Sequence, residues 1–133
     1  MGGLLIAQIL EDSKAVATSA KTLILQPMTA VPELREYLVQ NGFKIDSEHI
    51  VREEEKLYVI IFATVGEDEP YTKAELFLGK KIIPGENYDA YRKEQLLKLT
   101  KQINGLSVSQ NGENQKRLLK LQKLKEMIED ENL

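Results

Sequence analysis

The chain has 133 residues, 42% of them hydrophobic, and a net charge of -3, which suits one domain or one small domain with an appendage. It has no cysteine and one histidine, His49, which excludes disulfides and argues against a metal site or a catalytic triad. The longest apolar run, about residues 57–65, is too short to span a bilayer. No basic region precedes the N-terminal apolar residues, as it would in a secretory signal. We therefore expect a cytoplasmic protein with no membrane contact.

Charge is distributed unevenly along the chain. From Lys80 to Lys125 there are eleven basic and four acidic residues, so the remainder is strongly acidic. This separation indicates a basic surface for a polyanion and an acidic body elsewhere. A solvated helical face is the alternative explanation, and charge by itself does not decide between the two.

The first predicted elements are a helix and a short strand. Residues 2–12 place apolar side chains at helical spacing after two glycines, which predicts a helix. Residues 22–26 are largely apolar and end before Pro27, which cannot donate to a β-ladder. This segment is typical of a buried parallel strand whose carboxyl end faces a ligand site.

A second helix and a hairpin are predicted next. Residues 31–41 have Pro32 at their start, where its missing N–H costs little. Residues 48–52 and 56–64 are strand-like and are joined by the acidic turn 53–55. Because both faces of the second strand are apolar, we expect it to be central in its sheet.

The C-terminal part predicts helices. Residues 72–83 form a short helix broken near Gly79, Asn87 is expected to cap a long helix that ends near residue 106, and residues 115–131 form the last helix. The spacing of the apolar residues in the two long helices is typical of an antiparallel coiled-coil hairpin. These apolar positions are Tyr88, Tyr91, Leu96, Leu99, Ile103 and Leu106 in the first helix, and Leu118, Leu121, Leu124 and Ile128 in the second.

Two short motifs could face a ligand. Gly2 and Gly3 precede a helix, whose N-terminus presents free N–H groups to a phosphate or substrate. Two glycines are a weak signal, and a flexible chain start is the favoured explanation. Gln26 ends a strand at the place where doubly wound folds bind ligands. Its amide could hydrogen-bond a base edge or a cofactor, and a plain strand-ending turn is the alternative.

Other polar clusters favour structural roles. The carboxylates of residues 53–55 lie on a hairpin tip, where they are solvated and lack the enclosure that tunes a general acid or base. Tyr88 and Tyr91, near Arg92 and Lys93, could stack on bases. Both tyrosines belong to the apolar stripe of their helix, so core packing is the stronger interpretation.

Five segments, in chain order, resemble the bacterial tRNA (adenine-N1)-methyltransferases that modify adenine 22. Residues 1–10 resemble the segment after the fourth strand of that family, where an Ala-Gly-Met-Gly-Gly turn occurs, and residues 23–27 resemble its fifth strand. Residues 34–43 and 48–58 resemble its next helix and closing hairpin. Residues 75–79, Glu-Leu-Phe-Leu-Gly, resemble its lead-in to a C-terminal coiled coil.

The resemblance implies an α/β fold, the C-terminal part of a Rossmann-like methyltransferase sheet (domain 1–70) followed by an antiparallel coiled-coil hairpin (domain 71–133). It implies S-adenosyl-L-methionine as cofactor and tRNA as partner. In the family the turn after strand four borders the methyl-transfer site, and Met28 stands where asparagine is often expected. The implied active-site loop residues are Met1, Gly2, Gly3, Gln26 and Pro27.

The cofactor motifs of the family's first half do not occur in these 133 residues. We therefore expect this chain to bind the cofactor weakly or not at all by itself, and to be inactive alone. The strand at residues 22–26 would also lack its fourth-strand neighbour. An exposed apolar edge invites pairing with another chain, so we expect dimerisation through it.

The leading hypothesis is the C-terminal portion of a tRNA adenine-N1 methyltransferase whose basic hairpin helps to hold tRNA. No catalytic base and no metal site is identified. The alternative is a non-catalytic module that binds RNA or a protein through the same hairpin. The expected RNA-binding residues are Arg92, Lys93, Lys116, Arg117 and Lys120.

Overall fold

The computed structural model describes residues 1–109 and 111–130. The chain packs as two compact units, Met1–Asp89 and Ala90–Leu133. The division into domains 1–70 and 71–133 stays a prediction. Within the described ranges no helix is long and apolar enough to cross a membrane.

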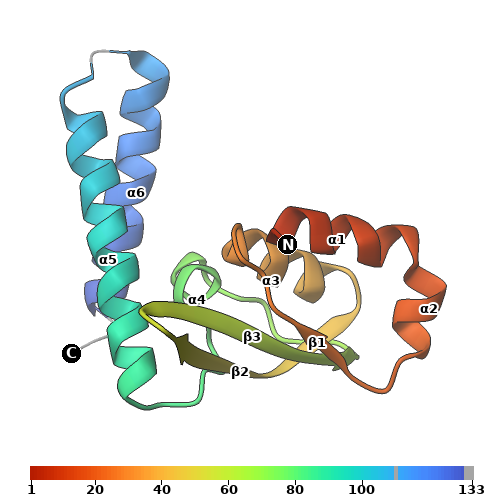
Figure 1. Cartoon of the computed structure of the whole chain (residues 1–133). Helices are drawn as coiled ribbons and strands as arrows, with labels where there is room; N and C mark the ends of the chain where they lie inside the picture. The colour runs from red at the N-terminus through yellow and green to blue at the C-terminus, as the bar shows by residue number, and fades with distance from the viewer. Residues whose placement is uncertain (110, 131–133) are drawn as a thin grey trace. The chain divides into compact units, whose positions relative to one another are not determined.

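The first unit contains a small sheet and four short helices (Figure 1). In chain order the elements are α1 (Gly3–Asp12), α2 (Lys14–Ser19), β1 (Leu23–Leu25), α3 (Val31–Gln40), β2 (Phe43–Glu53), β3 (Lys56–Val65) and α4 (Lys73–Leu78). The structure confirms the predicted helices before and after β1, the strand β1 itself and the hairpin that follows. The sequence pattern does not predict α2, because its six residues bury only Ala17 and therefore carry no apolar stripe.

The sheet has the order β1-β3-β2, and both pairings are antiparallel. The central position predicted for the second hairpin strand is confirmed. In the register, Ile61 of β3 pairs with Leu25 of β1 and Glu48 of β2. A bulge between Ile45 and Ser47 shifts the register of the hairpin.

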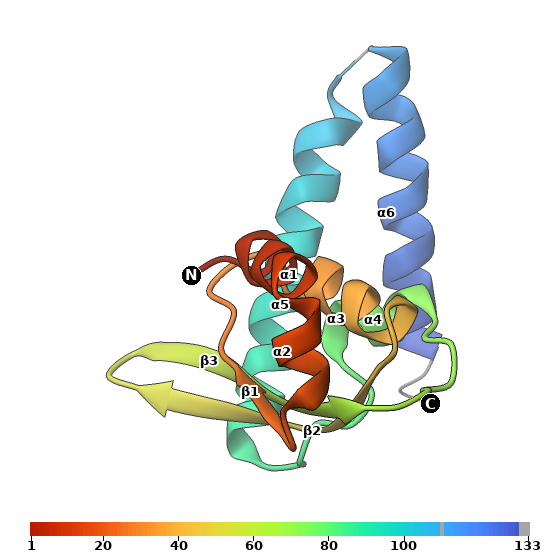
Figure 2. The same ribbon diagram turned by 90° about the vertical axis from the view of Figure 1, so that its right-hand side faces the viewer.

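Helices α1, α3 and α4 lie over one face of the sheet (Figures 1 and 2). The four-residue spacing of Leu34 and Leu38 puts both side chains on the inner side of α3, where they are fully buried. Phe43, Ile45 and Ile61 are fully buried on the strands. Alternation along the strands thus gives the sheet one core-facing side.

The two edges of the sheet differ. The outer edge of β2 is covered by the segment after α4, since the Glu48 N–H donates to Lys81 O at 3.0 Å and the Ile83 N–H to Glu48 O at 2.9 Å. In the described part of the chain β1 has β3 as its one strand neighbour. The parallel pairing predicted for this strand is not seen with β3, because β1 pairs antiparallel with it. The expected exposed apolar edge is confirmed, since Ile24 is 65% exposed.

Helix α4 is shorter than predicted. Thr72 and Glu75 form a capping box at its start, with the Thr72 N–H donating to Glu75 Oε1 at 2.8 Å. Gly79 has a φ of 97°, which a glycine adopts readily. The predicted break near Gly79 is confirmed, and the helix does not resume toward residue 83 because this backbone turn redirects the chain to pair with Glu48.

Two long helices follow, α5 (Glu86–Ser107) and α6 (Gly112–Asp130). The prediction that Asn87 caps the first long helix is wrong. Asn87 lies inside α5, and its Nδ2 donates to Ile50 O at 3.3 Å. Helix α6 begins earlier than predicted, because Asn111 Oδ1 accepts the Glu113 N–H at 2.8 Å and caps it. The predicted end at residue 131 lies outside the described residues.

The apolar stripes predicted for α5 and α6 are confirmed as the less exposed sides of these helices. Every stripe position is buried or half-buried. Apolar residues off the stripes, Leu97 and Leu119, are 58% and 60% exposed. Near the start of α5, Arg92 Nη2 donates to Ile128 O near the end of α6 at 3.4 Å, so the two helices run in opposite directions.

Candidate functional site

The predicted active-site loop residues lie together, where the chain start contacts the turn after β1. The Met28 N–H donates to Met1 O at 2.8 Å, and the Gly3 N–H donates to Thr29 O at 2.6 Å. Gln26 is exposed and Pro27 is buried in this turn. The five residues belong to two segments that are far apart in the sequence, and backbone hydrogen bonds hold these segments side by side.

Gly2 and Gly3 permit this close approach. A Cβ on Gly2 would lie 2.5 Å from Thr29 Oγ1, and a Cβ on Gly3 would lie 2.8 Å from Thr29 O. Ala30 follows with a φ of 52°, in the left-handed region. The two glycines therefore allow close packing against the turn after β1. Neither explanation drawn from the sequence, a phosphate-facing turn or a flexible chain start, predicts this packing.

A cavity of about 360 Å³ opens beside this turn. Its lining residues are Met1, Ile6, Ile9, Leu10, Ile24, Leu25 and Gln26. The Gln26 amide is the one polar side chain of this lining, which offers no acidic or basic side chain for proton transfer. S-adenosyl-L-methionine carries an amino-acid group and ribose hydroxyls that need several polar partners. The residues present therefore do not fit the whole cofactor.

Helix α1 is held against α3 near this site. The Tyr37 hydroxyl donates to Glu11 Oε2 at 2.7 Å. Burial, followed by the hydrogen bond to Glu11 and its charge, raises the pKa of Tyr37 to about 12. This contact fixes the helix that follows the glycines.

A second cavity of about 450 Å³ lies between α3 and the segment that leads into α4, with Asp68 and Tyr71 in its lining. Burial by itself would raise the pKa of Asp68, but hydrogen bonds from Lys81 Nζ, 3.1 Å away, and from the Ile45 N–H lower it overall. Burial raises the pKa of Tyr71, whose hydroxyl has no hydrogen-bond partner in the described part of the chain. Among the described residues no group of His, Cys, Asp or Glu could hold a metal ion.

The predicted RNA-binding residues lie on α5 and α6. Lys93, Lys116, Arg117 and Lys120 are exposed, and none of them forms an ion pair with another described residue. Arg92 is half-buried and donates to the Ile128 carbonyl, as described above. The positively charged groups on these two helices are thus largely available to solvent.

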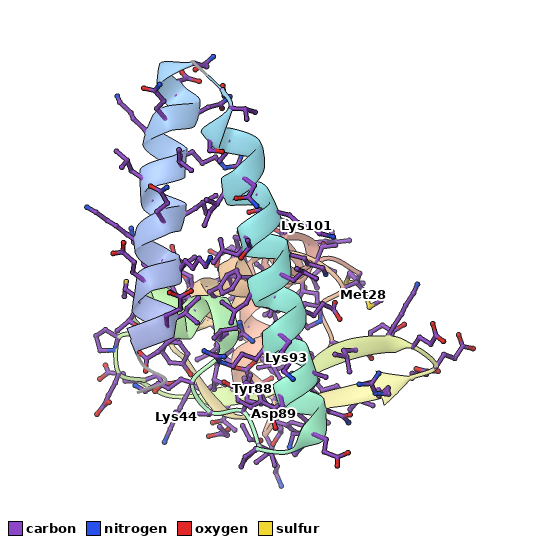
Figure 3. All side chains as sticks on the ribbon, turned by 90° about the vertical axis from the view of Figure 1, so that its left-hand side faces the viewer. Met28, Lys44, Tyr88, Asp89, Lys93 and Lys101 are labelled. Carbon is purple, nitrogen blue, oxygen red and sulfur yellow. The ribbon has the colours of Figure 1, made fainter. Side chains whose placement is uncertain are left out.

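Further lysines extend this set, and sequence spacing could have indicated them. Figure 3 shows Lys93 and Lys101 along α5, eight residues apart and therefore on the same side of the helix. On α6, Lys123 follows Lys116 and Lys120 at helical spacing and is exposed. We name Lys93, Lys101, Lys116, Arg117, Lys120 and Lys123 the basic helical surface.

Comparison with known proteins identifies one family. The model of the TrmK family, tRNA (adenine(22)-N(1))-methyltransferase, matches residues 1–132. The tRNA (adenine(22)-N(1))-methyltransferase of Bacillus subtilis (strain 168) is 36% identical over 85 residues, which cover 63% of this chain and 36% of that protein.

Two solved structures are similar over nearly the whole chain. A protein of the NADB-Rossmann superfamily from Streptococcus agalactiae has a TM-score of 0.77 and 29% identity, and the match covers 98% of this chain. A Streptococcus pneumoniae protein assigned to the tRNA (m1A22) methyltransferases, solved in complex with S-adenosyl-L-methionine, has a TM-score of 0.69 and 29% identity, with 96% of this chain covered. The chain spans 56% of the length of each of these two proteins.

Proposed function

Because the chain belongs to the tRNA (adenine(22)-N(1))-methyltransferase family, we propose that it acts as the C-terminal part of an enzyme that methylates N1 of an adenine in tRNA. The observation that carries this proposal is the continuous family match over residues 1–132. The Rossmann-like α/β fold of the first unit agrees with it. We place this activity in the cytoplasm.

S-adenosyl-L-methionine would supply the methyl group. Support comes from the related S. pneumoniae structure, which contains this cofactor. In this chain the apolar cavity with Gln26 at its rim suits a border of the transfer site and does not suit a grip on the charged ends of the cofactor. Such a border would orient the reacting groups and exclude water, which are major sources of rate enhancement.

This part of the proposal has a direct test. Isothermal titration of the chain alone with S-adenosyl-L-methionine should show weak binding or none, because Gln26 is the one polar side chain of the cavity. Tight binding would contradict the assignment of the cofactor grip to another part of the enzyme. It would also exclude a purely non-catalytic module.

We further propose that α5 and α6 form a coiled-coil hairpin that holds tRNA through the basic helical surface. The buried stripes of both helices support the coiled coil, and the exposed lysines support contact with phosphates. A protein that neutralises phosphates releases counterions, so its affinity falls steeply with salt.

The test compares two double charge reversals with the same change in net charge. Lys116→Glu/Lys120→Glu should weaken tRNA binding about tenfold or more and reduce its salt slope by about 2, since the slope is close to one per phosphate contact. The control Lys21→Glu/Lys44→Glu changes exposed residues of the first unit and should leave both values near those of the parent. Equal effects of the two variants would reject the basic helical surface.

A non-catalytic binding module is the second candidate function. It would bind RNA or a protein through the same helices, and the exposed side chains of the basic helical surface favour it. For a chain without a partner at its sheet edge, we also propose self-association through β1, because unpaired strand edges recruit other strands. Sedimentation of the isolated chain as a monomer at all concentrations would contradict this association.

A further inference from the structure

The second cavity of the first unit is separate from the turn after β1. Helices α3 and α4 lie side by side (Figures 1 and 2), and the cavity of about 450 Å³ is lined by the C-terminal half of α3, from Glu36 onward, and by the segment that leads into α4. It shares no lining residue with the cavity beside Gln26. Its volume lies in the range of about 300–1,000 Å³ that is typical of small-molecule sites.

One hydroxyl in this lining lacks a partner. The Tyr71 hydroxyl is buried, and no residue in the described ranges forms a hydrogen bond with it. Buried polar groups of folded proteins almost always have a partner, which can be protein, water or ligand. Burial, followed by the charges of Asp68 and Glu48, raises the pKa of Tyr71, so the hydroxyl keeps its proton. A ligand suited to the cavity should therefore offer this hydroxyl an acceptor.

The two carboxylates of the lining differ in what they already bind. Asp68 accepts hydrogen bonds from Lys81 Nζ at 3.1 Å and from the Ile45 N–H at 3.2 Å. The Glu36 side chain is exposed and has no hydrogen bond or ion pair with another described residue. Gln40 lies one helical turn further along α3, and its amide is equally unengaged. Asp68 therefore has a structural role, whereas Glu36 and Gln40 are available to a ligand.

The rest of the lining supplies a positive charge and apolar contacts. Lys73 is exposed and forms no ion pair with a described residue. The apolar side chains are those of Val39, Pro70 and Leu76. A fitting ligand combines an apolar body, hydrogen-bond donors for Glu36 and an anionic group for Lys73. A simple organic cation fits less well, because Lys73 would repel it.

We propose that this cavity binds a guanine nucleotide, with the base edge toward Glu36 and Tyr71 and the phosphate toward Lys73. The Watson–Crick edge of guanine has two adjacent donors, N1–H and the N2 amino group, beside the O6 acceptor. A carboxylate accepts from both donors, and the Tyr71 hydroxyl donates to O6. The other RNA bases lack two adjacent donors on this edge. The nucleotide is either free or an unpaired guanosine of RNA, whose exposed base edge a protein can read.

Calorimetric titration of the intact chain with guanosine monophosphate (GMP) tests the base contact. Glu36→Gln should weaken binding about tenfold or more, because its amide presents a donor where the carboxylate only accepts. Glu33→Gln changes an exposed glutamate of the same helix outside the lining and should leave the affinity unchanged. Adenosine and cytidine monophosphates should bind about tenfold more weakly than GMP.

Two further substitutions test the phosphate and the hydroxyl contacts. Lys73→Met should weaken GMP binding about tenfold and leave guanosine binding unchanged, since only the nucleotide carries a phosphate. Lys44→Met, at an exposed lysine outside the lining, is its control. Tyr71→Phe should weaken the binding of both ligands. The unfolding midpoint of the ligand-free chain should not fall in this variant, because the hydroxyl has no partner in the described part of the chain.

Two short RNAs that differ only in their central base, 5′-UUGUU-3′ and 5′-UUAUU-3′, distinguish the sources of the guanine. Tighter binding of the guanine-containing RNA, lost in Glu36→Gln, would assign the site to unpaired guanosine in RNA. Binding of GMP with no preference between the RNAs would assign it to a free nucleotide. The absence of both, equal affinities for GMP and adenosine monophosphate, or equal effects of Glu36→Gln and Glu33→Gln would overturn the proposal. The inference does not depend on the proposed function, since these measurements need no methyl transfer.

Discussion

The guanidinium of Arg35 and the carboxylate of Glu48 form an ion pair with a Nη2–Oε1 distance of 2.9 Å, and both side chains are fully buried. Arg35 also donates from Nη1 to Leu76 O at 2.7 Å and to Phe77 O at 3.1 Å. One side chain thus connects α3, β2 and the last carbonyls of α4. The Glu48 backbone pairs with Lys81 and Ile83, so this pair secures the segment that precedes α5.

Loss of one member of this pair should be strongly destabilising. Arg35→Met leaves the Glu48 carboxylate buried without its cation, which costs about 3–5 kcal/mol. Arg35→Met/Glu48→Met should recover only part of this loss, because the carbonyls of Leu76 and Phe77 remain without their donor. Urea unfolding measures both free energies.

The control for this prediction is an exposed ion pair with a similar distance. Glu94 and Lys98 on α5 are 3.1 Å apart and largely solvated. Glu94→Gln should change the free energy of unfolding by about 0.5 kcal/mol or less. If Glu94→Gln and Arg35→Met had similar effects, the buried pair would not have the structural role assigned to it.

Gly3→Ala should destabilise the first unit. Its new Cβ would lie 2.8 Å from Thr29 O, and relief of such overpacking costs about 1–3 kcal/mol. Gly105→Ala is the control, because a methyl group at this position of α5 would have no neighbouring atom within 4 Å. That change should stabilise the chain by about 0.5–1 kcal/mol, since alanine is the better helix former. Thermal unfolding of the two variants should shift in opposite directions.

Alkaline pH should weaken the contact between α1 and α3. The pKa of Tyr37 is about 12 in the folded chain and 10.0 in its ordinary state. Between these values the unfolded chain loses the phenolic proton while the folded chain retains it, so stability falls as pH rises. Tyr37→Phe should flatten this part of the stability curve, and Glu11→Gln should flatten it in part. An unchanged slope between pH 10 and 12 in Tyr37→Phe would contradict the assignment.

Two leucines of α5 test the helical stripe. Leu99 is 2% exposed and Leu97 is 58% exposed. Leu99→Ala should cost about 2–5 kcal/mol through lost burial and a cavity, whereas Leu97→Ala should stay within about 0.5 kcal/mol. Helicity followed by circular dichroism during urea unfolding measures both. Equal midpoints would show that the stripe does not carry the packing of this helix.

Local patterns in the sequence were sufficient for most of the elements. The central position of β3 could be predicted because both of its faces are apolar, and the stripes of α5 and α6 because helical spacing repeats within a few residues. The proximity of Gly2 and Gln26 came from the resemblance to a family. No local pattern predicts it, because the contact depends on hydrogen bonds between residues far apart in the chain, from Met28 to Met1 and from Gly3 to Thr29.

Only the tertiary structure decided which charged groups are buried and that the outer edge of β2 is covered. Arg35 and Glu48 look like ordinary surface residues of a helix and a strand, and their pairing depends on how α3 crosses β2. Asn87 resembles a helix cap, but Ile50 O on a distant strand is its partner. The spacing of apolar residues predicts which side of a single helix or strand is buried. It cannot predict these contacts, because they join residues far apart in the chain. The sequence by itself therefore determined most of the elements, the family and the expected open edge at β1, and the tertiary structure determined the ion pair and the covered edge at β2.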